Sequence, residues 1–280
     1  MLKNILTDKA SKLFIVLGGF FVANAILAEL IGVKIFSLEN SLGIAPLDLN
    51  ILGIDGLSFN LTTGVLLWPF VFVLTDLINE YYGKRGVQLL SYLTVGLIVY
   101  AFAMVFVGIH LTPADFWPQS HINPALPMDE QEMLRSQVGN YDAAFRLVFG
   151  QGLWIIIGSL VAFLVGQIID ITVFQKVKQL TGESMIWLRA TGSTLVSQLI
   201  DSFIVLFIAF YIGADWSLQL VLAIGVVNYI YKFSMAILMT PLLYAVHYLI
   251  ERYLGEEQAA TMKQDALIKA PLINSVISQA

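Results

Sequence analysis

The chain contains no cysteine and only three histidines, which limits the chemistry open to it. Without cysteine it can form neither disulfide bonds nor thiolate-ligated metal centres. His110, His121 and His247 lie too far apart along the chain to suggest a metal-binding motif. Any function must therefore use carboxylates, amides, hydroxyls or lysine, and we expect neither a metal nor a cofactor.

Charged residues are also scarce, at 12% of the 280 residues, whereas 58% are hydrophobic and the mean hydropathy is +0.80. A soluble domain carries about twice that share of charged residues. The composition therefore predicts an all-α integral membrane protein that contacts the lipid bilayer and no nucleic acid. A glycine-rich phosphate-binding loop is missing as well, which excludes ATP hydrolysis by this chain but not energising by a partner ATPase. A homo-oligomer stays open.

The apolar runs are long enough to predict transmembrane helices. We expect six of them, over residues 13–36, 61–82, 87–109, 147–174, 188–212 and 218–250. The first is too long for a cleaved signal peptide. Pro69 falls in the middle of the second, where it should kink the helix. Together they form one domain over residues 1–250.

The connections between these helices predict the orientation of the chain. Residues 37–60 form a loop without Lys or Arg, and residues 110–146 form a longer acidic loop whose second half has the periodicity of an amphipathic helix. Eleven Lys and Arg residues lie in the proposed inner segments, against two in the outer loops. Because basic residues favour the cytoplasmic side, both termini should lie inside, and residues 251–280 should form a mobile cytoplasmic tail.

Polar side chains interrupt two neighbouring helices in the same order. Gln167 precedes Asp170 by three residues, and Gln198 precedes Asp201 by three. A charged group near the middle of a bilayer costs at least about 2.5 kcal/mol, so it normally faces a cavity or a partner. We therefore expect both Gln-x-x-Asp motifs to face the interior of the bundle.

The last predicted helix supplies a cation at a similar depth. Asn228, Tyr229 and Lys232 share one face, and Lys232 could pair with Asp201. An ion pair that only fixes helix packing remains the alternative to a ligand site. In the first helix, Asn24 is the deepest polar residue, while Glu29 and Lys34 read as an interfacial pair.

The end of the second predicted helix carries two acidic residues, Asp76 and Glu80, on one face. They could couple transport to protons or form an inner gate. Alternatively, they could form a polar helix end paired with Lys84 and Arg85.

An intramembrane aspartyl protease would also need two aspartates on adjacent helices. The axial offset expected between Asp170 and Asp201 is too large for a shared proton, and neither lies in a Gly-x-Gly-Asp sequence. We therefore do not expect an enzyme.

Three polar stretches carry a resemblance to a known family. They are LTDLINEYYGKR at the end of the second helix, GQIIDITVFQKVKQLTGESMIWLRATGSTLVSQLIDS across the fourth and fifth, and Lys232 with Thr240-Pro241. The chain resembles the queuosine precursor transporter family, which is related to the S components of energy-coupling-factor transporters. The resemblance implies a six-helix bundle in the bacterial inner membrane that imports 7-cyano-7-deazaguanine, its aminomethyl derivative or queuine. It also allows a binding subunit energised by a partner ATPase.

The residues suit such a ligand on chemical grounds. A 7-deazaguanine presents an N–H and an NH₂ side by side, which a carboxylate can accept, and a carbonyl to which an amide or lysine can donate. We expect acidic, amide and aromatic contacts from Asp201 or Asp170, from Gln198, Gln167, Asn228, Lys232 and Asn24, and from Trp68 or Tyr229.

Overall fold

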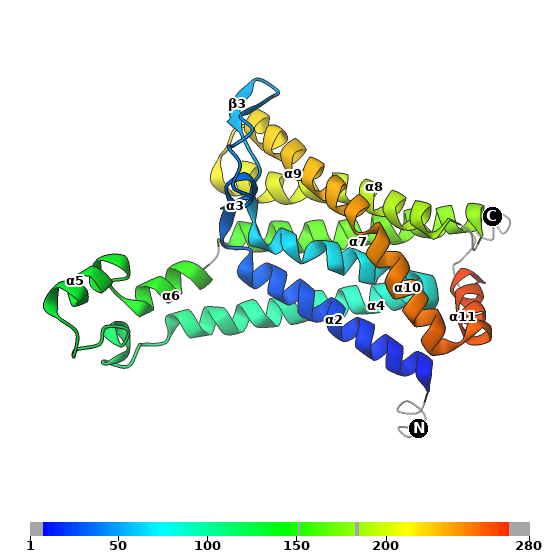
Figure 1. Cartoon of the computed structure of the whole chain (residues 1–280), viewed down its shortest axis with the longest axis horizontal. Coiled ribbons are helices and arrows are strands. Elements are labelled where there is room, and N and C mark those ends of the chain that lie inside the picture. Colours follow the sequence, from blue (N-terminus) through cyan, green and yellow to red (C-terminus); the bar gives the residue numbers. More distant parts are fainter. Residues whose placement is uncertain (1–7, 151, 183–184, 269–280) are drawn as a thin grey trace.

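The computed structural model describes residues 8–150, 152–182 and 185–268, which form a helical bundle with two smaller extensions at one end (Figure 1). The long helices are α2 (Lys9–Ile31), α4 (Trp68–His110), α7 (Leu153–Thr181), α8 (Ile186–Leu206) and α9 (Leu218–Leu238). Shorter helices are α3 (Leu38–Ser41), α5 (Met128–Gln137), α6 (Tyr141–Phe149), α10 (Thr240–Leu254) and α11 (Glu256–Ile268). Two 3₁₀ turns, η1 (Thr63–Leu66) and η2 (Trp117–Gln119), and a π-helical turn, η3 (Phe207–Ile212), complete the helical elements of these residues.

Five helical stretches of the described chain are long and apolar enough to cross a membrane, and they contain α2, α4, α7, α8 with η3, and α9. Large apolar side chains such as Phe20, Leu89 and Phe106 are exposed on their outer faces. Water would make such a continuous apolar surface costly, whereas lipid does not. The prediction of a helical membrane protein is confirmed.

α4 is broken at Gly83, where φ is 67° and ψ is −173°, and the chain turns back after this residue (Figure 1). Only glycine adopts this conformation readily. A Cβ at this position would also lie 3.0 Å from the carbonyl oxygen of Ala266 in α11. The residues before and after the break, 68–82 and 84–110, correspond to the second and third predicted helices.

The predicted start of the second helix and its kink are wrong. Residues before Trp68 form strand β4 (Asn60–Thr62) and η1, where Leu61 and Val65 are buried in a small apolar cluster. Pro69 therefore stands in the first turn of α4. A proline there costs no hydrogen bond, because the first amide groups of a helix have no partner within it.

The predicted helix 218–250 is two helices, α9 and α10, which meet at Met239. Pro241 stands in the first turn of α10 and cannot donate the backbone hydrogen bond that would continue α9. The predicted mobile tail is also wrong where it is described. Residues 256–268 form α11, which packs on α4 with Ala259 and Ala266 buried. Residues 269–280 lie outside the described part.

The predicted loop 37–60 contains short strands. β1 (Ile35–Ser37) pairs antiparallel with β4, Ile35 facing Thr62, and β2 (Leu49–Ile51) pairs with β3 (Ile54–Leu57). In the longer connection, the expected single amphipathic helix is two helices, α5 and α6, which extend away from the bundle (Figure 1). Asn140 caps the second by accepting from the amide of Ala143, so the chain is interrupted there.

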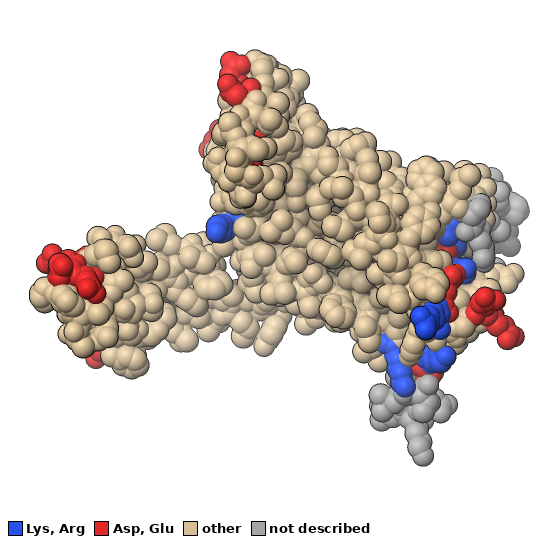
Figure 2. All heavy atoms as spheres, viewed as in Figure 1, with Lys and Arg blue, Asp and Glu red and all other residues tan. Residues whose placement is uncertain are grey.

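Charges separate towards the two ends of the molecule (Figure 2). Lys and Arg gather at the end that carries α11, together with some acidic residues, while the extensions at the other end show mainly Asp and Glu. The band between them is almost free of charge in this view, as expected for the part that contacts lipid.

Candidate functional site

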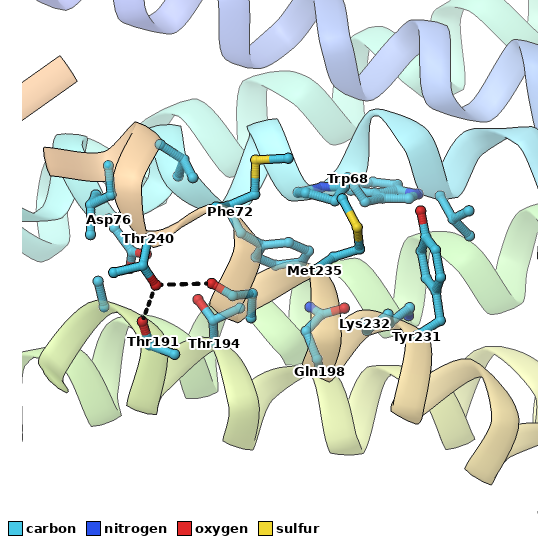
Figure 3. A pocket seen from close by; sticks show the side chains of 17 residues that line it. Trp68, Phe72, Asp76, Thr191, Thr194, Gln198, Tyr231, Lys232, Met235 and Thr240 are labelled. Carbon is cyan, nitrogen blue, oxygen red and sulfur yellow. Dashed lines mark hydrogen bonds between the residues drawn. The ribbon is translucent and has the colours of Figure 1, made fainter. Parts of the chain in front are cut away.

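The two parts of α4, residues 68–82 and 84–110, are its first and second arms. One pocket lies between the first arm, α8 and the corner at which α9 meets α10 (Figure 3). Its cavity volume is about 40 Å³. A single water needs about 10–15 Å³, so the pocket has room for a few waters in this conformation. A flat heterocycle would require some side chains to move.

Apolar and aromatic side chains form most of the pocket wall. Trp68 is tilted against Phe72 and Phe163, at ring-centre distances of 6.3 and 5.6 Å. Tyr231 and Met235 come from α9 on the facing side (Figure 3). Planar walls of this kind suit a planar ligand, and Trp68 was predicted as a stacking residue.

Two polar side chains that line the pocket have unused hydrogen-bonding capacity. Gln198 is 2% exposed and its Nε2 has no partner among the described residues. Asp76 is 5% exposed, and its Oδ1 has none either. Leaving a buried polar group unpaired costs about 1–3 kcal/mol, so both atoms are candidates for contact with a ligand. Thr191 and Thr240, by contrast, bond each other at 3.2 Å and join α8 to α10.

Lys232 is the pocket's basic residue, and it is paired. Its Nζ lies 2.5 Å from Oδ2 of Asp201, which confirms the predicted pair between α9 and α8. Only Lys232 lines the pocket, while Asp201 stands behind it. Asp201 faces Gly166 of α7, where an added Cβ would lie 3.6 Å from the Cβ of Asp201, an ordinary van der Waals contact.

Asp170 and Gln167, the other Gln-x-x-Asp motif, lie outside the pocket lining. Asp170 is fully buried and accepts from Ser197 Oγ at 3.2 Å, and Gln167 donates to Thr75 Oγ1 at 3.2 Å. Oδ2 of Asp170 has no partner in the described chain. Asp170 therefore helps join α7 to α8.

Asp76 and Asp170 approach the same turn of α8. Ser193 and Thr194 of that turn lie next to both carboxyl groups. Asp170 and Asp201, by contrast, are offset by one helical turn, about 6 Å along the axis. That distance agrees with the argument against a proton shared by these two residues.

Glu80 belongs to a separate buried cluster nearer the α11 end. Arg189 contacts it through Nη2 at 2.7 Å and Nε at 3.1 Å, and Lys178 Nζ lies 3.1 Å from Oε2. All three side chains are at most 1% exposed. The alternative of a pairing between Glu80 and Lys84 or Arg85 is wrong, because cations from α7 and α8 reach Glu80 from inside the bundle.

Besides Asp201, Asp170 and Gln167, three more predicted ligand residues do not line the pocket. Asn24 and Asn228 donate to carbonyl oxygens of their own helices, those of Phe20 at 2.8 Å and Ile224 at 3.0 Å. Tyr229 packs edge-on against Phe233. The pocket takes Tyr231 instead, two residues later and on another side of the helix.

Glu29 and Lys34, the expected interfacial pair, have different surroundings at the outer end of α2. Glu29 is buried and accepts a hydrogen bond from Ser159 of α7, while Lys34 is exposed. Glu29 therefore ties α2 to the bundle.

Sequence reasoning missed Thr194 and treated Lys178 and Arg189 only as markers of the cytoplasmic side. A buried acidic residue such as Glu80 requires a cation, which is the signal that could have led to them. The sequence alone does not single out the partner, because five basic residues lie in the neighbouring inner segments: Lys84, Arg85, Lys176, Lys178 and Arg189.

Comparison with known proteins agrees with this architecture. A family model described as "Putative vitamin uptake transporter" matches residues 62–246, more than half of the chain. A "Probable queuosine precursor transporter" of Bacillus subtilis (strain 168) is 28% identical over 193 residues, 68% of this chain and 72% of that protein. One of the same description from Haemophilus influenzae is 27% identical, over 65% of this chain and 66% of that protein. No solved structure matches. The chain therefore belongs to the family of vitamin uptake transporters, whose members are transporters and not enzymes.

Proposed function

We propose that this protein imports a 7-deazaguanine precursor of queuosine across the bacterial inner membrane and binds it in the pocket between α4, α8 and α9–α10. The observation that carries the proposal is the pocket itself, with aromatic walls, two buried polar atoms without partners and one lysine. The names of the two relatives supply the substrate class.

The pocket has the groups that a neutral, planar, polar base requires. Trp68 offers a face for stacking, and Gln198 and Lys232 offer donors for a carbonyl. Asp201 holds Lys232 in place. Six predicted residues lie outside the lining and are not counted as ligand contacts in this conformation: Asn24, Asn228, Tyr229, Asp170, Gln167 and Asp201.

Six crossings, with both termini inside, describe the topology best. α2, the two arms of α4, α7, α8 with η3, and α9 supply the six. The α11 end, where Lys and Arg gather in Figure 2, is then cytoplasmic. In this orientation the Glu80–Arg189–Lys178 cluster forms the inner closure of the bundle.

Cysteine labelling tests this orientation, since the chain contains no cysteine of its own. Single cysteines replacing the exposed residues Asn50 and Asn123 should react with an impermeant maleimide in intact cells. Cysteines replacing Gln179 and Ala260, which are exposed at the other end, should react only after permeabilisation. The opposite pattern would refute the orientation.

Transport by the isolated protein tests the function. Proteoliposomes that contain only this chain should exchange labelled 7-cyano-7-deazaguanine against the unlabelled compound, because the pocket needs no second protein. An imposed pH gradient should raise uptake if the buried carboxylates Asp76 and Asp170 couple it to protons. Empty liposomes are the control. Binding without exchange would instead favour a subunit energised by a partner ATPase, and neither binding nor exchange would refute the proposed substrate.

A further inference from the structure

We propose that Asp76 is the specificity-determining residue of this pocket, the carboxylate that accepts the adjacent N–H and NH₂ groups of the guanine-like edge. The inference rests on the proposed function, because it names the group by which that substrate class is selected. It differs from the expectation drawn from the sequence, which gave this role to Asp201 or Asp170.

The pocket lining favours Asp76 over the other carboxylates. Among the described residues that line the pocket, Asp76 is the acidic one. Asp201 stands outside the lining and is held at 2.5 Å by Lys232, so its charge is already matched. Asp170 also lies outside the lining, bonded to Ser197.

Asp76 stands beside two hydroxyl side chains and keeps hydrogen-bonding capacity for a ligand. Ser193 and Thr194 of α8 lie next to its carboxyl group. Its Oδ1 has no partner in the part of the chain that the structure describes, and the side chain is buried. The edge of a 7-deazaguanine carries two parallel donors, which match the two oxygens of a carboxylate.

Gln198 is placed to donate a hydrogen bond to the carbonyl next to this edge of the base. Gln198 follows Thr194 by four residues on α8, so the two side chains share a face about 6 Å apart along the axis. In a guanine-like base the carbonyl adjoins the N–H on the same edge, so its partner must stand beside the carboxylate that binds the N–H. A base bound edge-on to Asp76 would therefore place its carbonyl near the unpaired Nε2 of Gln198.

Such recognition makes the 2-amino group of the ligand the basis of selection. A ligand without this group leaves a carboxylate oxygen unpaired, whereas adding or removing an apolar substituent does not. Wild-type protein should bind 7-cyano-7-deazaguanine about ten-fold or more tightly than the analogue that lacks the 2-amino group.

The test measures both affinities by calorimetry for the purified full-length protein and its variants. Asp76→Asn should bind 7-cyano-7-deazaguanine about ten-fold or more weakly, and its preference for the 2-amino group should fall to near one. The ratio of two affinities within one variant does not depend on how much of the sample is folded. Asp76→Glu keeps the carboxylate and should keep the preference, which provides a second variant if Asp76→Asn does not fold.

Asp170→Asn is the matched control, because it makes the same change at a buried aspartate that contacts the same serine and threonine but does not line the pocket. Its preference for the 2-amino group should persist. An unchanged preference in Asp76→Asn, or a lost preference in Asp76→Glu, would overturn the role of Asp76 and leave the proposed function standing. If the wild-type protein binds neither compound, the proposed function fails and the inference fails with it.

Discussion

Replacing Glu80 with glutamine is expected to destabilise the protein by about 3–5 kcal/mol, the usual cost of removing one partner from a buried ion pair. Glutamine has nearly the same size, so packing should not change. It removes the negative charge that matches both Arg189 and Lys178, which are at most 1% exposed. Thermal unfolding in detergent, followed by circular dichroism, should show a clearly lower midpoint.

Glu257→Gln is the control for this measurement, because Glu257 is exposed on α11 and the same change there should shift the midpoint little. Since the cluster joins α4, α7 and α8, transport by Glu80→Gln should also suffer if these helices close the inner end of the pocket. A midpoint equal to that of the wild-type protein would show that the two cations are matched by other groups.

Much of the bundle could be predicted from the sequence, because apolar length is a sufficient signal for a membrane-spanning helix. The start of the second helix was predicted wrongly, because the apolar residues before it are buried in a strand and a turn and not in a helix. Leu61 and Val65 extend the hydrophobic run before Trp68, yet they are buried against Tyr231 as part of a strand and a 3₁₀ turn. Hydropathy alone does not separate a buried turn from the first turns of a helix.

The C-terminal helix was not predictable for the opposite reason. α11 is mixed in charge, and nothing in its local pattern indicates a partner. It is ordered by tertiary contacts, one of which places Ala266 against the bare backbone of Gly83. Such a contact depends on the break in α4, which is itself specified by a single glycine.

The site was partly predictable. The predictions that hold are those that depend on how deep a residue lies in the membrane. Asp201 and Lys232 were paired because a topology of six spans brings them to the same level, and the structure places them in contact. Depth does not fix the rotation of a helix. Tyr229 and Tyr231 have nearly the same depth but different directions, and only Tyr231 lines the pocket.

Replacing Asp201 with asparagine is expected to lower uptake of 7-cyano-7-deazaguanine about ten-fold or more, because it leaves Lys232 charged and unmatched beside the ligand. The loss of stability should be smaller than for Glu80→Gln, since the two side chains are 17% and 14% exposed. Uptake into proteoliposomes and the unfolding midpoint, measured on the same preparation, separate the two effects.

The double variant Asp201→Asn with Lys232→Met decides between a purely structural pair and a pair that serves the ligand. Removing both charges should restore the unfolding midpoint, because no unmatched charge remains. If the pair only fixes helix packing, uptake should return together with stability. If Lys232 donates to the carbonyl of the base, stability should return while binding stays weak, and the preference for the 2-amino group should persist because Asp76 is intact. A double variant that binds as tightly as the wild-type protein would remove Lys232 from the site and leave Gln198 as the donor.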